Sequence, residues 1–186
     1  MINLQSNSIR RFPRLAAGGA LAGLAVLLLT ALPLAVADRG QNNRAPNLPA
    51  ALQVPPGNTV AFHAFAVGVQ IYEWSGSAWV FVAPEAVLFA DAGGHGEVGI
   101  HYAGPTWESQ SGSKVFGARV AGATVDPTAI PWLLLRAVST EGPGIFHRVT
   151  FIQRVNTTGG TAPATPGTGA GSRVEVLYTA EYVFYR

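Results

Sequence analysis

The chain has 186 residues, the length of one ordinary domain with an appendage. Its formal net charge is +2, but three of the twelve basic residues and none of the ten carboxylates lie in the first 37 positions, so the rest of the chain carries about −1. This balance disfavours a nucleic-acid partner, which requires clustered Lys and Arg. The chain has no cysteine, which excludes thiol catalysis, Cys-ligated zinc and iron–sulfur clusters, and we expect no cofactor.

Residues 1–37 have the features of an export signal. Three arginines between positions 10 and 14 precede an uncharged apolar run over 15–36, and the run ends at the small-x-small site Ala35-Val36-Ala37. The run is also long enough for an uncleaved membrane anchor, and Arg10-Arg11 permits a twin-arginine route, although Phe12-Pro13 departs from that motif. We predict a signal peptide and a secreted or periplasmic protein of the cell envelope. Contact with a membrane is expected only through this segment, if it is not removed.

Residues 38–58 are polar and then proline-rich, without a helical or strand period, which predicts a linker. From Thr59 onward, short alternating runs recur every 8 to 15 residues between turn signals, and no window has a clean helical period. This pattern predicts a single antiparallel all-β domain over 59–186. A β-sandwich and a barrel both fit it.

The first predicted strand pair is an aromatic hairpin. Runs over 69–74 and 79–82 flank Ser75-Gly76-Ser77-Ala78, which suits a two-residue turn at Gly76-Ser77. In that register Trp74 faces Trp79, and Tyr72 faces Phe81. The resulting aromatic face is typical of a core, and it also suits stacking on a flat ligand or a sugar.

The second half of the chain predicts three more strands. The continuous apolar run over 132–138 suggests a strand covered on both faces, in which Arg136 would need a carboxylate, a carbonyl or a bound anion as a partner. A strand over 146–155 would place Val149, Phe151 and Val155 on one face and Arg148, Thr150 and Arg154 on the other. The low-complexity segment 157–172 predicts a flexible loop, and a last strand over 174–185 is expected to close the sheet.

The segment Gly94-His95-Gly96-Glu97-Val98-Gly99 matches the glycine fingerprint of dinucleotide-binding folds. That fingerprint works because a helix follows it and directs its N–H groups at a pyrophosphate. Here the next residues read as a strand broken at Pro105. We therefore expect a hairpin connection over 91–99 and no nicotinamide nucleotide.

The candidate site lies within 81–114, the window that is richest in polar side chains able to do chemistry. The bend at Gly104-Pro105 follows a histidine and precedes a tryptophan and a glutamate. We predict ligand contacts from the residues around this bend and from one later lysine, namely His101, Tyr102, Trp107, Glu108 and Lys114. His101 with Glu108 is also a candidate acid–base pair. No regular element obliges His95 and His101 to converge, so no metal site is predicted.

The chain resembles a secreted family known as domain of unknown function 3455 over about 49–186. The motifs that carry the resemblance are AFHA (61–64), VQIY (69–72), FVAPEA (81–86), HYAGPTWE (101–108), GSKV (112–115), IPWLL (130–134), FIQRVN (151–156) and YTAEY (178–182). The resemblance brings no established activity. Some relatives carry a malate dehydrogenase label. That label is not transferred to this chain, because no helix is expected after the glycine-rich segment. Relatives often contain cysteines, and any disulfide that they form is absent from this chain.

The sequence thus favours a non-catalytic binding or envelope-associated module, whose partner is an unidentified small molecule or envelope component. The alternative is an exported enzyme that uses His101 and Glu108. The observation that discriminates between the binding module and the enzyme is whether His101, Trp107, Glu108 and Lys114 converge in one concave pocket.

Overall fold

The computed structural model describes residues 48–186, and the predicted signal segment and its cleavage site lie outside them. Eight strands make up most of this part, together with one turn of 3₁₀ helix, η1 (Ala50–Leu52). The strands are β1 (Val60–Trp74), β2 (Trp79–Phe89), β3 (Glu97–Tyr102), β4 (Thr106–Ser109), β5 (Lys114–Ala123), β6 (Trp132–Glu141), β7 (Phe151–Gly159) and β8 (Arg173–Tyr185). No helix among residues 48–186 is long and apolar enough to cross a bilayer.

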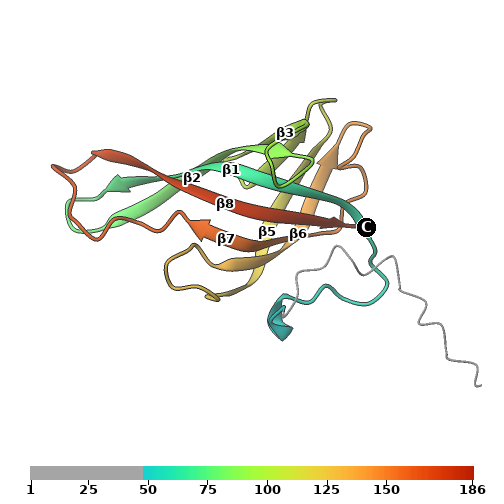
Figure 1. The fold of residues 1–186 in the computed structure, drawn as a ribbon, viewed down its shortest axis with the longest axis horizontal. Coiled ribbons are helices and arrows are strands. Elements are labelled where there is room, and N and C mark those ends of the chain that lie inside the picture. The colour runs from blue at the N-terminus through green and yellow to red at the C-terminus, as the bar shows by residue number, and fades with distance from the viewer. Residues whose placement is uncertain (1–47) are drawn as a thin grey trace, which may run out of the picture. The chain divides into compact units, whose positions relative to one another are not determined.

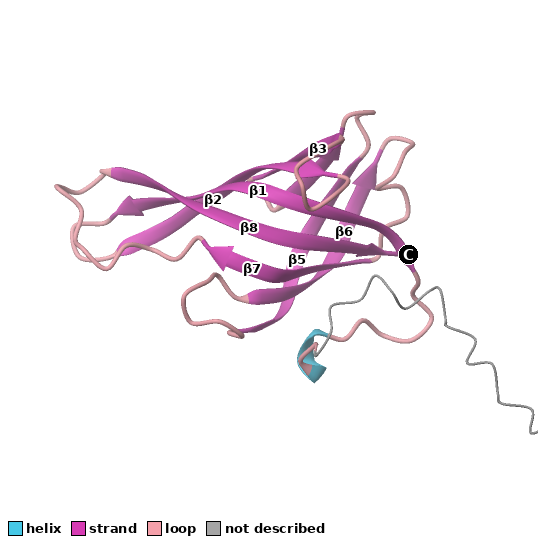
Figure 2. Ribbon diagram, viewed as in Figure 1, coloured by secondary structure: helices cyan, strands magenta, loops and turns pink. Residues whose placement is uncertain are grey.

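The strands form a closed antiparallel barrel in chain order (Figures 1 and 2). The prediction of an antiparallel all-β domain is confirmed, and the architecture is a barrel. The last strand closes it as expected, because β8 pairs with β1 along one side and with β7 along the other. Closure leaves the main body of the sheet without an edge that could pair with another chain.

The aromatic hairpin between β1 and β2 has the predicted register. Trp74 pairs with Trp79 and Tyr72 pairs with Phe81, with ring centroids 5.4 Å and 5.8 Å apart. The turn is closed by a hydrogen bond from Ser75 N to Ala78 O of 2.9 Å. This hairpin and the start of β8 project beyond the shorter strands (Figure 1). There the loop before β8 meets them, and Trp79 Nε1 donates to the carbonyl of Thr165 at 2.9 Å.

The opposite end of the barrel is filled by aromatic side chains. Phe146 and Phe184 are fully buried with centroids 4.7 Å apart, and Phe62 packs on both of them. Phe146 and Val149 belong to the β6–β7 connection, so the predicted strand over 146–155 begins only at Phe151. Phe146 and Val149 are large and apolar because they are buried in the core at this end of the barrel, and not because they belong to a strand.

The outer face of β6 and β7 is covered by the segment that precedes β1. Leu52 of η1 is completely buried against Trp132, Leu134 and Val155. The expectation that ordered structure starts near Thr59 is therefore corrected, because Leu48 and Leu52, both before Thr59, are packed in this cluster. The first half of β6 is covered on both faces as predicted, with Leu135 in the barrel core.

The arginines of β6 and β7 take opposite sides of the barrel wall. Arg136 is exposed on the outer side, so it needs none of the partners that a buried charge would require. Arg154 lies on the face of β7 opposite to Phe151 and Val155, as predicted, and these two apolar residues point outward under the η1 segment. Arg154 therefore faces the barrel interior, beside Leu133 and Tyr182. Val149, predicted on the face of Phe151 and Val155, instead precedes β7 and packs in the barrel core.

The hairpin connection predicted over 91–99 joins β2 to β3, but it runs only over 90–96, because β3 begins at Glu97 and includes the last three residues of the predicted connection. The element that follows β3 is the strand β4, not a helix. Asp91 holds the preceding turn, since its Oδ1 accepts the backbone N–H groups of Gly93 at 2.8 Å and His95 at 3.1 Å. The helix amino terminus that a pyrophosphate requires is therefore missing at this point of the described chain.

Candidate ligand-binding cavity

The β3–β4 hairpin sorts the predicted site residues onto two faces. His101 pairs with Trp107, and the adjacent pair is Ile100 with Glu108. Directly paired residues share a face and successive residues alternate. His101 and Trp107, which are 2% and 1% exposed, thus point into the barrel, while Glu108 points outward. The two members of the candidate acid–base pair face opposite sides of the sheet.

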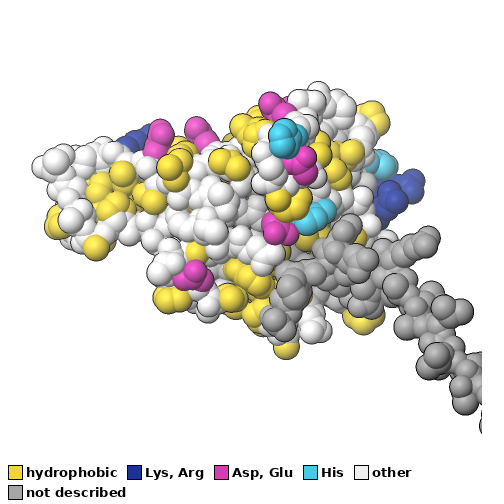
Figure 3. Space-filling view, in the orientation of Figure 1, with side chains coloured by type: hydrophobic (Ala, Val, Ile, Leu, Met, Phe, Trp, Pro, Cys, Tyr) yellow, Lys and Arg dark blue, Asp and Glu magenta, His cyan; other side chains and the backbone are white. Residues whose placement is uncertain are grey.

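Tyr102, Glu108 and Lys114 form a polar network on the outer face. The Tyr102 hydroxyl donates to Glu108 Oε2 at 2.9 Å, and Lys114 Nζ lies 3.2 Å from the same oxygen. Both donors lower the pKa of Glu108, and the carboxylate in turn raises the pKa of Lys114. Solvent-exposed networks of this kind contribute little stability. Figure 3 shows one face of the outer surface, on which a few acidic side chains are scattered among hydrophobic and other groups.

His101 is held as a neutral ring inside the barrel. Its Nδ1 lies 2.8 Å from the carbonyl oxygen of Thr106. A carbonyl oxygen only accepts, so Nδ1 carries the proton, and in the neutral ring Nε2 remains an acceptor. Burial lowers the pKa of His101 from 6.5 to about 3, and the charge of Arg154 acts in the same direction. The imidazole also stacks on Trp107, with centroids 4.4 Å apart.

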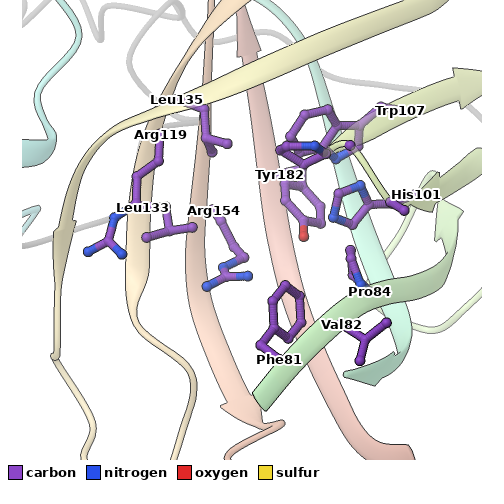
Figure 4. Close-up of a pocket in the computed structure, with 13 residues that line it drawn as sticks. Phe81, Val82, Pro84, His101, Trp107, Arg119, Leu133, Leu135, Arg154 and Tyr182 are labelled. Atoms are coloured by element: carbon purple, nitrogen blue, oxygen red, sulfur yellow. The ribbon is translucent and has the colours of Figure 1, made fainter. Parts of the chain in front are cut away.

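A cavity of about 220 Å³ lies next to this stack, toward the end of the barrel at which the hairpin projects. Its walls are mainly apolar and come from strands on both sides, including Phe81 and Pro84 of β2 and Leu133 and Leu135 of β6. The β3–β4 turn contributes its Gly104-Pro105 bend. Figure 4 shows these walls facing one another across the cavity. Phe81 was predicted in an aromatic face and begins the 81–114 window, but it was not among the predicted ligand contacts.

Two arginines face the same cavity. Arg154 of β7 is partly buried, and its Nε and Nη2 donate to the carbonyl of Pro131 at 3.2 Å and 2.9 Å. Arg119 of β5 is more exposed and lies on the inward side, since it pairs with Leu135. Within residues 48–186, neither arginine forms an ion pair with a carboxylate, and the described cavity lining contains no Asp or Glu. The cavity therefore carries uncompensated positive charge.

Two residues that line the cavity, Tyr182 and Trp107, carry buried polar groups. Tyr178 and Tyr182 approach each other with hydroxyl oxygens 3.5 Å apart, and burial raises the pKa of both, so they are protonated at neutral pH. Trp107 Nε1 is a buried donor without a hydrogen-bond partner in the described part of the chain. An unsatisfied buried donor costs about 1–3 kcal/mol. This donor remains available to an acceptor that reaches it.

His95, the histidine considered with His101 for a metal site, lies away from the cavity. His95 sits in the exposed β2–β3 turn, where its Nδ1 is 3.1 Å from Asp91 Oδ1. His101 is inside the barrel, so the two rings occupy separate environments. Among residues 48–186, no three His, Asp or Glu side chains gather closely enough to hold a metal ion.

The structure thus brings His101 and Trp107 to the cavity and leaves Tyr102, Glu108 and Lys114 on the outer face. Sequence reasoning missed three polar lining residues: Arg119, Arg154 and Tyr182. The alternation in β7 did mark Arg154 as opposite to Phe151 and Val155. It carried no sign of which face points inward, because both faces of this strand are covered.

The profile of one protein family matches residues 55–186, which include the whole barrel. The chain has no match among curated proteins and none among solved structures. The family match confirms the resemblance carried by the motifs between positions 61 and 182. Since it spans well over half of the chain, the protein belongs to the family described as protein of unknown function (DUF3455).

Proposed function

We propose that this barrel is a binding module for a small organic molecule, which it holds in the cavity beside His101 and Trp107. The observation that carries the proposal is the combination of apolar walls with two arginines that no carboxylate of the described chain neutralises. Ligand sites are typically concave and mostly apolar, with a few polar groups that fix the orientation of the ligand. Mouths of β-barrels are frequent places for such sites.

The dimensions favour a small ligand. Clefts that enclose drug-sized molecules measure roughly 300–1,000 Å³, whereas this cavity measures about 220 Å³. A single ring or a short chain with one polar group matches it better than a nucleotide or an oligosaccharide. The proposal is binding without catalysis, because the acid–base pair considered from the sequence is divided between the inner and outer faces.

The test uses indole as a neutral probe, titrated into the full chain and followed by calorimetry. Leu133 lines the cavity, so Leu133→Trp should fill it and weaken indole binding at least tenfold. Leu177→Trp is the matched control, because Leu177 is 76% exposed and lies outside the cavity lining. Its affinity for indole should equal that of the original chain.

Three results would contradict the proposal. One is that neither indole nor a small aromatic acid such as 4-hydroxybenzoate binds at millimolar concentration. Another is unchanged indole binding in a Leu133→Trp protein whose circular dichroism and thermal unfolding show that it is folded. Equal weakening by both tryptophan variants would likewise place the probe outside the cavity.

We also propose that the module acts outside the cytoplasm, in the envelope or the medium. The support is the order of basic segment, apolar run and Ala35-Val36-Ala37 site in the sequence. Amino-terminal sequencing of the exported protein should begin at Asp38. A full-length product that stays in the membrane fraction would instead indicate an uncleaved anchor.

A further inference from the structure

We infer that the ligand is a small hydroxylated aromatic monocarboxylate, bound with its carboxylate toward Arg154 and its hydroxyl toward His101. This inference rests on the proposed function and specifies the chemistry of the ligand. Three features of the cavity carry it: the charge of the arginines, the aromatic side chains in its walls and the fixed tautomer of His101.

The charge of the cavity selects an anion. Arg154 is the more deeply placed of the two cations. Its Nε and Nη2 donate to Pro131 O and its guanidinium group also interacts with the Tyr182 hydroxyl, while Nη1 donates to no carbonyl of the described chain. A guanidinium group in an apolar setting gains most from a planar, singly charged carboxylate, to which it can donate two parallel hydrogen bonds. Arg119 at the exposed side of the cavity would attract the same anion as it enters.

The walls select a flat ring. His101 and Trp107 are stacked with an interplanar angle of 11°, and Tyr182 meets both of them edge-on at centroid distances of 5.1 Å and 5.4 Å. Phe81 closes the cavity from β2, and Figure 4 shows its ring directed toward Arg154 and Tyr182. An aromatic ligand can make stacked or edge-to-face contacts with such walls, worth about 0.5–1.5 kcal/mol each.

The far side of the cavity selects a hydrogen-bond donor. His101 Nδ1 is committed to Thr106 O, so Nε2 is an acceptor that finds no second partner in the described chain. A ligand hydroxyl can donate to Nε2. A second carboxylate would instead face the lone pair of Nε2, which repels it, with no cation at this point to stabilise it. This difference predicts a hydroxy-acid and disfavours a diacid.

The experiment compares four probes on the full chain by calorimetry: 4-hydroxybenzoate, benzoate, 4-hydroxybenzamide and terephthalate. We expect 4-hydroxybenzoate to bind most tightly. The amide, which has the same shape without the charge, should bind at least tenfold more weakly. Benzoate should bind several-fold more weakly, and terephthalate at least tenfold more weakly, than 4-hydroxybenzoate.

Variants assign the two ends of the ligand. Arg154→Gln should abolish the preference for 4-hydroxybenzoate over 4-hydroxybenzamide, and Arg154→Lys should retain part of it. Arg136→Gln is the matched control, because Arg136 is an exposed arginine on the strand next to β7 and faces the outer side. His101→Phe keeps an aromatic ring but removes the acceptor, so it should abolish the preference for 4-hydroxybenzoate over benzoate.

The outcomes separate this inference from the proposed function. If indole binds in the cavity but the four probes bind equally, or Arg154→Gln leaves the charge preference intact, the ligand class is wrong and the binding module stands. If neither indole nor any of the four probes binds, the proposed function itself fails. Equal effects of Arg136→Gln and Arg154→Gln would mean that net charge, not the cavity, selects the anion, which also overturns the inference. The comparison of probes on the unaltered chain decides the question even if a variant does not fold.

Discussion

The imidazole of His101 stacks on the indole of Trp107, with centroids 4.4 Å apart and planes inclined by only 11°. The two residues are direct cross-strand partners on β3 and β4, so the register of one short hairpin produces the stack. The hydrogen bond from His101 Nδ1 to Thr106 O fixes the rotation of the ring. The arrangement buries an ionisable ring in its neutral form, which makes the fold sensitive to acid.

The first prediction is a loss of stability at acid pH that depends on His101. Its pKa is about 3 in the folded protein, against 6.5 for an unperturbed histidine, so between these values the unfolded chain binds a proton that the folded chain does not. The contribution of His101 to the free energy of unfolding is therefore fully present above pH 6.5 and is lost as the pH is lowered toward 3. The contribution of this group is at most about 1.4 kcal/mol per pH unit.

The measurement is urea unfolding at several pH values between about 7 and 4, a window in which the unfolded chain takes up the proton and the folded chain does not, on the original chain and on His101→Gln. The variant should lack the His101 component, so the difference between the two free energies should shrink as the pH falls. The other histidines and the outer Tyr102–Glu108–Lys114 network are common to both proteins and cancel. A difference that is independent of pH would show that His101 is not buried as a neutral ring.

The parts of the fold that could be predicted from the sequence are those fixed by local chemistry. Gly76-Ser77 allows a tight turn, and a tight turn sets the register of its strands, so Trp74 and Trp79 were paired correctly. The bend at Gly104-Pro105 pointed to the β3–β4 hairpin in the same way, and two residues of that hairpin, His101 and Trp107, line the cavity. Their contact with a ligand stays a prediction. Neither prediction needed knowledge of distant segments.

The remaining site residues depend on contacts between segments that are far apart in sequence. Alternation shows that a strand has two faces, but only the packing of other segments shows which face is inside. In β7 the outward residues Phe151 and Val155 are apolar because the η1 segment, far earlier in the chain, covers them. The polar residue Arg154 therefore points inward, which reverses the usual expectation. Glu108 was assigned to the site by proximity along the chain, although the register places it outside.

The second prediction concerns the aromatic hairpin. Trp74 and Trp79 are in edge-to-face contact but only half-buried, so each substitution by Ala should cost less than the roughly 3–5 kcal/mol of a fully buried aromatic residue. A double-mutant cycle measured by chemical unfolding should give a coupling of about 1 kcal/mol. Val80→Ala is the control, because Val80 lies on the same hairpin and is 54% exposed. The absence of coupling between the two tryptophans would argue against their contact.

The third prediction concerns the close approach of β1 and β2 at Gly68. A Cβ atom on Gly68 would overlap the carbonyl of Glu85 and the backbone of Ala86, its partner in the register. Gly68→Ala should therefore lower the free energy of unfolding by about 1–3 kcal/mol, as overpacking does elsewhere. Gly169→Ala is the matched control, because a Cβ there would enter open space. Equal stability of the two variants in thermal unfolding would show that the strands are further apart than described.

The last prediction is that the residues before β1 are part of the folded domain. Leu52 is completely buried in a cluster with Trp132, Leu134 and Val155, and its carbonyl accepts from Gln153 Nε2 at 2.6 Å. Leu52→Ala removes the side chain but keeps this backbone hydrogen bond, so the loss measured by urea unfolding reports the cluster alone and should be about 2–5 kcal/mol. Gln53→Ala, at the exposed next position, should change the free energy by less than about 0.5 kcal/mol. If both variants are as stable as the original chain, the segment is a tether as the sequence suggested, and the outer face of β6 and β7 must then be covered in some other way.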